Sequence, residues 1–219
     1  MTTDERGWAA DEVRAAERPL LEAGVPLMRM AARALAAEVR AMRPTSLLVL
    51  AGSGDTGGDG MFAAAELAGE GVPVAVWQVG SRVHDEALRA AMDAGARRVP
   101  AYSGEDVVLD GILGIGARPP LRDPARSAVA SLLAADPRPR IVAVDLPSGV
   151  DPDDGAADEV VLPAEVTVTF GAIKRGLLRE PGRSLAGRVV LVDLGLELRG
   201  IHETGPSSAA GESAPDGAA

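Results

Sequence analysis

The chain has no cysteine, only two histidines and a single lysine among its 219 residues. The lack of cysteine excludes disulfides, thiolate catalysis and cysteine-ligated zinc or iron–sulfur centres. The histidines, His84 and His202, lie in segments that the sequence predicts to be exposed, which argues against histidine chemistry. No apolar run reaches the roughly 18 residues of a membrane span, so no transmembrane helix and no membrane association are expected.

Lys174 is the one lysine of the chain, and every other basic residue is an arginine. An ammonium is a compact charge, whereas a guanidinium is a planar fork with different hydrogen-bonding geometry. A chain that otherwise uses arginine can therefore keep a lysine where a compact charge is needed. Chance survival of one lysine is the alternative, and the residues around Lys174 decide between the two.

The formal net charge of -10 disfavours nucleic acid and an anionic membrane surface as partners. A length of 219 residues suits one sizeable α/β domain. The start of the chain is charged throughout and lacks the apolar segment of a signal peptide, so we expect a cytoplasmic protein. We expect one domain over residues 1–201 and a disordered tail over 202–219, where the composition cannot bury apolar surface.

Short apolar segments alternate with helix-like segments from residue 46 onward, after two helices predicted between residues 9 and 42. Strands are expected at 46–51, 72–78, 106–110, 140–145, 165–170 and 188–194, with a further short one at 98–100, and helices near 59–70, 84–95 and 123–135. Continuous apolar strands such as 141–144 indicate a parallel sheet covered on both faces. The predicted fold class is therefore α/β.

A glycine-rich segment, Gly52–Gly60, follows the first predicted strand and leads into a predicted helix. Glycine lets a ligand approach the main chain closely, and the free N–H groups of a helix N-terminus favour an anion. The segment also contains G-x-G-x-x-G through Gly52, Gly54 and Gly57, which is compatible with an NAD-dependent dehydrogenase. The second predicted strand ends without the acid that binds the ribose of NAD, and this disfavours a dehydrogenase.

Three further strand ends carry acids, glycines or the lysine. They are Asp110–Gly116, Val144–Gly149 and Thr169–Lys174. Because ligands bind at the carboxyl ends of parallel strands, we expect these segments and the glycine-rich segment to form one pocket. Within them, Thr56, Asp110 and Ser148 offer only oxygen donors, which suit an alkali or alkaline-earth ion.

These four segments, in this order, resemble the motifs of the NAD(P)H-hydrate epimerase family, also called the YjeF N-terminal domain family. The family patterns are G-x-G-N-N-G-G-D-G, D-x-x-x-G-x-G, V-D-x-P-S-G-x-D and T-F-G-x-x-K-x-G, and the matching segments are Gly52–Gly60, Asp110–Gly116, Val144–Asp151 and Thr169–Gly176. Residues 24–31 and 190–195 are similar to further family segments, so the resemblance covers about residues 8–198. Asp55 and Thr56 stand where the family has two asparagines.

The resemblance implies a Rossmann-like three-layer α/β/α sandwich with a mostly parallel central sheet. It implies interconversion of the R and S hydrates of NADH and NADPH, which carry a hydroxyl at C6 of the reduced nicotinamide ring. The implied substrate-binding residues are Asp55, Thr56, Gly57, Gly58, Asp59, Gly114, Ile115, Gly116, Ala117, Arg118, Pro119, Pro120 and Asp145. One potassium ion per subunit is implied near Thr56, Asp110 and Ser148. A partner dehydratase that uses ADP or ATP and accepts only the S form is implied too, and a homodimer is left open.

Inversion at C6 needs no C–H bond to break, because this carbon bears both the hydroxyl and the ring nitrogen. Either the hydroxyl leaves and water returns on the other face, or the ring opens to an aldehyde and recloses. Both routes need a general acid and a general base, for which Asp110 and Asp145 are the candidates unless Asp110 is committed to the ion. Lys174 is the third catalytic candidate, either stabilising a carboxylate or binding phosphate. Because Asp55 and Thr56 replace the paired asparagines, a non-catalytic nucleotide-binding or scaffold domain is the alternative function.

Overall fold

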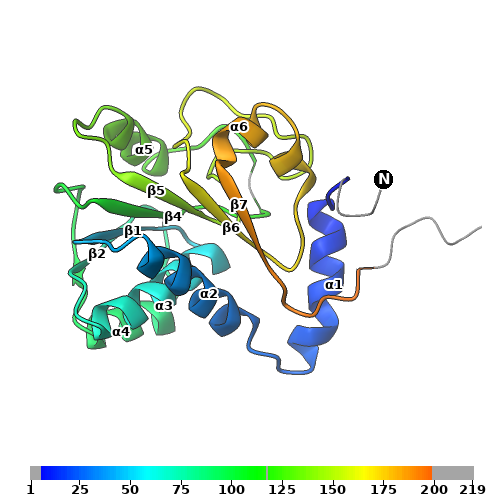
Figure 1. Cartoon of the computed structure of the whole chain (residues 1–219), viewed down its shortest axis with the longest axis horizontal. Helices are drawn as coiled ribbons and strands as arrows, with labels where there is room; N and C mark the ends of the chain where they lie inside the picture. The colour runs from blue at the N-terminus through cyan, green and yellow to red at the C-terminus, as the bar shows by residue number, and fades with distance from the viewer. Residues whose placement is uncertain (1–5, 117, 199–219) are drawn as a thin grey trace, which may run out of the picture.

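Seven parallel strands form the centre of the molecule, whose structure, a computed structural model, describes residues 6–116 and 118–198 (Figure 1). They are β1 (Leu47–Ala51), β2 (Val74–Gln78), β3 (Arg97–Arg98), β4 (Val107–Gly111), β5 (Arg140–Val144), β6 (Val166–Phe170) and β7 (Arg188–Val192). Across the sheet the order is β3-β2-β1-β4-β5-β6-β7, and all neighbouring strands are parallel. The order therefore reverses beside β1, and ligands of such sheets bind at the carboxyl ends of the strands near this reversal.

The strands read as continuous apolar runs because both faces of the sheet are covered. Alternate side chains of a strand point to opposite faces. In β1, Leu47 and Val49 join the core on one face, whereas Leu48 and Leu50 join the core on the other. All four side chains are fully buried, so the strand shows no alternation of apolar and polar residues.

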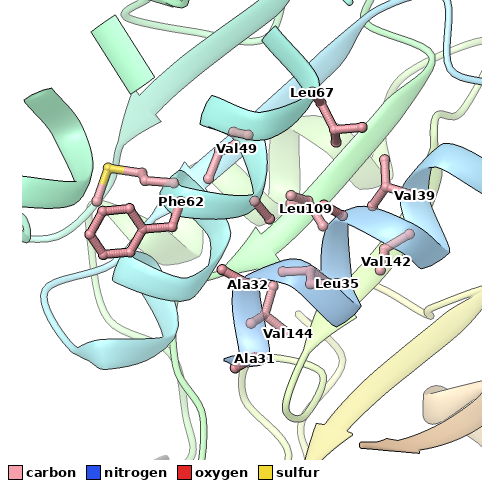
Figure 2. Close-up of a cluster of buried hydrophobic side chains, with 14 of the residues drawn as sticks. Ala31, Ala32, Leu35, Val39, Val49, Phe62, Leu67, Leu109, Val142 and Val144 are labelled. Carbon is pink, nitrogen blue, oxygen red and sulfur yellow. The ribbon is translucent and has the colours of Figure 1, made fainter. Parts of the chain in front are cut away.

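Helices cover both faces of the sheet and confirm the predicted three-layer sandwich (Figure 1). They are α1 (Ala10–Glu22), α2 (Leu27–Ala41), α3 (Asp55–Gly69), α4 (Asp85–Asp93), α5 (Ala125–Leu133) and α6 (Gly182–Ala186), with a short 3-10 helix at Arg175–Leu178. α2, α3 and α4 lie on one side of the sheet and α5 on the other. Figure 2 shows the core under α2, where Leu35 and Val39 lie beside Leu109 and Val142 of the sheet.

α1 stands beside the segment that follows β6 rather than on a face of the sheet (Figure 1). Its approach is fixed by a bridge in which the Trp8 N–H donates to the Ile173 carbonyl at 2.8 Å and the Arg175 N–H donates to the Trp8 carbonyl at 3.0 Å. Gly7, just before this bridge, has φ +64, and a Cβ there would lie 2.9 Å from Arg175 Cα. Only glycine combines this conformation with so close an approach, and the result is that α1 lies next to Lys174.

Several element boundaries differ from the sequence prediction by one or two residues, and the start of α3 differs most. α3 begins at Asp55 rather than near residue 59, so much of the glycine-rich segment is helix and not loop. The interior glycines disfavour a helix by propensity, but Gly57 lies so close to Gly52 that its Cβ would be 2.5 Å from the Gly52 carbonyl oxygen. Close packing therefore outweighs propensity. The third strand lies at Arg97–Arg98 rather than at 98–100.

The predicted tail, 202–219, lies outside the described residues. Within the described part of the chain, no helix combines the length and apolar character needed to cross a membrane.

Candidate active site

A cleft of about 550 Å³ lies at the carboxyl ends of the central strands. Its walls come from α1, the first turns of α3, the turn after β4, the residue that follows β5 and the end of β6. Ligand pockets usually measure about 300–1,000 Å³, so this cleft is large enough for a small molecule or part of a dinucleotide.

Seven of the substrate-binding residues expected from the sequence line this cleft. They are Asp55, Thr56, Asp59, Gly114, Ile115, Gly116 and Asp145. Gly57 and Gly58 lie behind it, where a Cβ on Gly58 would be 2.9 Å from Met28 Sδ, so these two glycines serve the packing of α3. Arg118, Pro119 and Pro120 are not among the lining residues, and Ala117 lies outside the described residues.

Lys174 is buried with 1% of its surface exposed and forms an ion pair with Asp145. Its Nζ donates to Asp145 Oδ1, to Thr169 Oγ1 at 3.1 Å and to the Phe170 carbonyl at 2.8 Å. These three acceptors use all three donors of an ammonium, which is the condition for burying such a charge. Of the two roles open for Lys174, the geometry is that of stabilising a carboxylate, because Lys174 does not line the cleft.

The two carboxylate oxygens of Asp145 have different surroundings. Besides the lysine, Oδ1 accepts the Thr169 hydroxyl at 3.2 Å and the Phe170 N–H at 3.4 Å. Oδ2 is turned toward Gly114, where an added Cβ would lie 3.0 Å from Oδ2 and 2.5 Å from Thr56 Oγ1. Asp145 also has φ +71, a left-handed conformation that aspartate tolerates better than most residues. The backbone thus presents one oxygen to the lysine and the other to the cleft.

Asp110 lies beneath the cleft and is completely buried. Its Oδ2 accepts the Ser148 N–H at 2.8 Å, and the Ser148 hydroxyl oxygen accepts the Leu113 N–H at 2.9 Å. Burial raises the pKa of Asp110 above its usual value, although the hydrogen bonds from Ser148 oppose this shift. Asp110 and Ser148 therefore brace the turn after β4 and do not line the cleft.

The three oxygen donors predicted to hold a cation gather around this turn. Thr56 Oγ1 faces Gly114, and the Thr56 carbonyl oxygen is 3.2 Å from where a Cβ on Gly111 would be. In the part of the chain that the structure describes, no group of three or more His, Cys, Asp or Glu is placed to hold a metal ion. Hydroxyl and carbonyl oxygens with one carboxylate fit a hard cation of low charge rather than zinc or copper.

Four carboxylates border the cleft: those of Glu17, Asp55, Asp59 and Asp145. Burial raises the pKa of Asp59 well above its usual value, and the charges of Asp145, Asp55 and Glu17 add to that shift while Lys174 opposes it. Burial likewise raises the pKa of Glu17. The sequence did not single out Glu17, because nothing in the spacing of α1 separates this acid from the other acids of the same helix.

A smaller apolar lobe of about 180 Å³ adjoins the cleft between α1, α2 and α3. Leu21, Leu27 and Met28 give it apolar walls, and Glu17 and Asp59 border both spaces. The site therefore combines a cleft bordered by four carboxylates with an adjoining apolar pocket.

His84 is half-buried rather than exposed as the sequence predicted, and it does not line the cleft. It caps α4, because its Nδ1 accepts the Ala87 N–H at 3.2 Å. Its ring also meets the Phe62 ring edge-on, with centroids 5.7 Å apart. These contacts give His84 a structural role.

The parallel sheet, the reversal of strand order at β1 and the cleft at that point define a Rossmann-like α/β protein. Residues 24–176 match the family model described as YjeF-related protein N-terminus, and the chain belongs to that family.

Curated relatives extend the match over most of the chain. A protein of Microbacterium testaceum named NAD(P)H-hydrate epimerase is 58% identical, over 89% of this chain and 81% of the relative. One of the same name from Clavibacter michiganensis is 49% identical, over 89% and 92% of the two chains. The Bifunctional NAD(P)H-hydrate repair enzyme Nnr of Mycobacterium tuberculosis is 41% identical over 87% of this chain, which spans only 42% of that relative.

A solved structure supports the fold independently. The crystal structure of the yeast protein ynu0 superimposes with a TM-score of 0.69 over 84% of this chain and 86% of the yeast chain. At 20% sequence identity, this likeness speaks for the Rossmann-like architecture alone.

Proposed function

We propose that the chain is an NAD(P)H-hydrate epimerase, an isomerase that interconverts the R and S forms of hydrated NADH and NADPH at C6 of the reduced nicotinamide ring. The observation that carries this proposal is the 58% identity to a relative of that name across most of both chains. The cleft agrees with it, since seven of the residues expected to bind the hydrated dinucleotide border one space.

Asp145 is the acid–base residue that the geometry favours. It forms an ion pair with Lys174 and lines the cleft, and its Oδ2 lies on the side of Gly114. In our proposal this oxygen takes the proton from the water that attacks C6, or returns it when the same face loses its hydroxyl. Lys174 acts through Asp145 and is a positioning residue, while buried Asp110 holds the turn that carries Gly114.

The first turn of α3 is the candidate phosphate site. Gly54, Asp55 and Thr56 of this turn line the cleft, and the N–H groups that open a helix lack partners within it and attract anions. Asp55 brings a negative charge to the same turn, so we expect affinity for the dinucleotide to differ from that of relatives with the paired asparagines. The backbone around Gly114–Gly116 supplies the facing wall.

We also propose that Thr56, Asp110 and Ser148 hold one potassium ion. The ion would supply positive charge that reduces repulsion between the diphosphate of the substrate and the acidic cleft. Epimerisation measured in potassium, sodium and choline chloride at equal ionic strength tests this proposal. Equal rates in all three salts would contradict it, and Ser148→Ala should weaken the dependence on potassium.

The bifunctional relatives point to a partner activity. Because such a relative is named a bifunctional NAD(P)H-hydrate repair enzyme, we propose that the product of this chain passes to an ADP- or ATP-dependent dehydratase specific for the S form. A homodimer stays a prediction, which sedimentation of the purified protein checks.

A coupled assay tests the proposed function. The R hydrate of NADH is mixed with an S-specific dehydratase and its nucleotide, and recovery of NADH is followed by its ultraviolet absorbance with and without this protein. We expect recovery far faster than the spontaneous rate, and Asp145→Ala and Asp110→Ala should each abolish the acceleration. Recovery at the spontaneous rate with the wild-type protein would instead indicate a non-catalytic scaffold.

A further inference from the structure

The cleft has two sides, and they carry different ionisable groups. One side is formed by the turn after β4, the start of α3 and the residue after β5. Gly114 joins these three segments, because a Cβ on it would touch both Thr56 Oγ1 and Asp145 Oδ2. Asp55 and Asp59 belong to this same side, since they lie on the first turns of α3 next to Thr56.

The other side is α1, whose inward face carries Glu17. Val13, Glu17 and Leu21 recur at intervals of four residues and so share one face of the helix. Val13 is completely buried in a core cluster with Trp8, while Leu21 lines the cleft beside Glu17. The face therefore runs from the core at Val13 to the open cleft at Leu21, which is 57% exposed, and the half-buried Glu17 between them borders both the cleft and its apolar lobe.

In the route in which the hydroxyl leaves and water returns, the proposed reaction needs proton transfer on both faces of the nicotinamide ring. The hydroxyl leaves C6 from one face and water adds to the other, so a group that serves one face is too far from the second. Asp145 serves the side formed by the sheet edge. Asp110, the second candidate from the sequence, is buried beneath that same side and does not line the cleft.

We propose that Glu17 is the second acid–base residue of the epimerase and serves the ring face that is turned toward α1. This inference rests on the proposed function. Glu17 donates its proton to the C6 hydroxyl, the C–O bond breaks, water leaves, and the lone pair of the ring nitrogen forms a C=N bond. A second water then attacks C6 from the other face, Asp145 takes its proton, and the electrons of the C=N bond return to nitrogen.

Charge and proton are conserved in this sequence. One turnover leaves Glu17 ionised and Asp145 protonated, which is the state needed for reaction in the opposite direction. Exchange with solvent through the open cleft resets both groups for another turnover in the first direction. The charges that act on Glu17 are those of the carboxylates of Asp145 and Asp55 and of the cations Lys174 and Arg14, and Asp59 and Arg18 line the same cleft. Burial and the neighbouring acids raise the pKa of Glu17, which favours the protonated form.

The experiment compares Glu17→Gln with the wild-type protein in the coupled assay. Glu22→Gln is the matched control, because Glu22 lies on the same helix but is exposed and borders neither space. We expect kcat of Glu17→Gln to fall about 100-fold or more, the usual range for loss of an acid–base group. We expect KM and the affinity for unreactive NADPH to change less than about threefold, since the glutamine keeps the size of the side chain and, like the protonated glutamic acid, carries no charge.

Chemical rescue separates proton transfer from a structural role. In Glu17→Ala, added formate should restore part of the lost rate, and formate should not affect Glu22→Gln. This variant also decides the matter if Glu17→Gln fails to fold, and thermal unfolding shows which variants are folded. Retention of kcat in Glu17→Gln, a change in KM alone, or a folded alanine variant that formate does not rescue would overturn the inference. Failure of the proposed function itself would be seen separately, as no acceleration by the wild-type protein.

Discussion

The ammonium of Lys174 lies against Oδ1 of Asp145, while Oδ2 of the same carboxylate faces Gly114 at the cleft. One oxygen therefore belongs to a buried ion pair and the other to the site. This division explains how a buried charge can serve both the stability of the fold and the proposed chemistry.

Replacing Lys174 by methionine should destabilise the protein strongly. The carboxylate of Asp145 would be left buried without its cation, and breaking such a pair by removing one partner costs roughly 3–5 kcal/mol. Adding Asp145→Asn should restore part of the free energy of unfolding, because the uncompensated charge is then removed and asparagine tolerates the left-handed conformation. Urea unfolding of both variants measures this, and a Lys174→Met protein as stable as the wild type would contradict it.

Gly114→Ala and Gly116→Ala form a matched pair in the turn after β4. The new Cβ at Gly114 would lie 2.5 Å from Thr56 Oγ1, whereas at Gly116 the nearest atom is Arg14 Nη2 at 3.9 Å. We expect Gly114→Ala to lose about 1–3 kcal/mol of stability and most of its epimerase activity. Gly116→Ala should keep its stability, and thermal unfolding and the coupled assay compare the two variants. Equal behaviour of the two variants would argue against this description of the site.

A second glycine pair lies at the start of the glycine-rich segment. A Cβ on Gly52 would overlap the Ile112 carbonyl, which cannot move without breaking the sheet edge, while a Cβ on Gly54 meets nothing within 4 Å. Gly52→Ala should therefore give little soluble folded protein, and Gly54→Ala should fold normally. Circular dichroism and yield from parallel preparations compare them. A well-folded Gly52→Ala variant would show that β1 and the turn after β4 are not packed as described.

The buried Asp59 should make stability depend on pH. Because its pKa is raised in the folded state, the folded protein binds more protons than the unfolded chain, and the free energy of unfolding falls as pH rises from about 4 through the raised pKa. The side chain introduced by Asp59→Asn cannot ionise, so the free energy of unfolding of this variant relative to the wild type should increase as pH rises. Urea unfolding across this range checks the trend, with the exposed Asp93→Asn as the control expected to show none. If the difference in free energy of unfolding between Asp59→Asn and the wild type does not change with pH, this prediction is wrong.

The order of elements and the place of the site follow from local patterns that a sequence displays directly. Apolar runs predicted the strands, and the residues at or after the strand ends predicted the edge of the sheet that carries the site. Asp145 after β5 and Gly114 after β4 are examples, because both line the cleft. The early start of α3 was missed, because helix propensity speaks against Gly57 and its neighbours whereas tertiary packing requires them.

Two features of the site had no local signal. The inward direction of Glu17 depends on how α1 docks beside the distant Lys174, and this contact links residues that are far apart in the chain. The different roles of Asp110 and Asp145 depend on depth, since Asp110 lies within β4 and is completely buried, whereas Asp145 follows β5 and lines the cleft. Long-range contacts of this kind are not encoded in the spacing of residues.

The bridge between Trp8 and the residues around Lys174 also constrains the order in which the site is completed during synthesis. α1 leaves the ribosome before any strand of the sheet, but its docking partner is made only after β6. α1, which carries Glu17, therefore remains undocked until the residues that follow β6 have been synthesised. A helix that is made before the sheet is thus among the last elements to dock, and the cleft is complete only then.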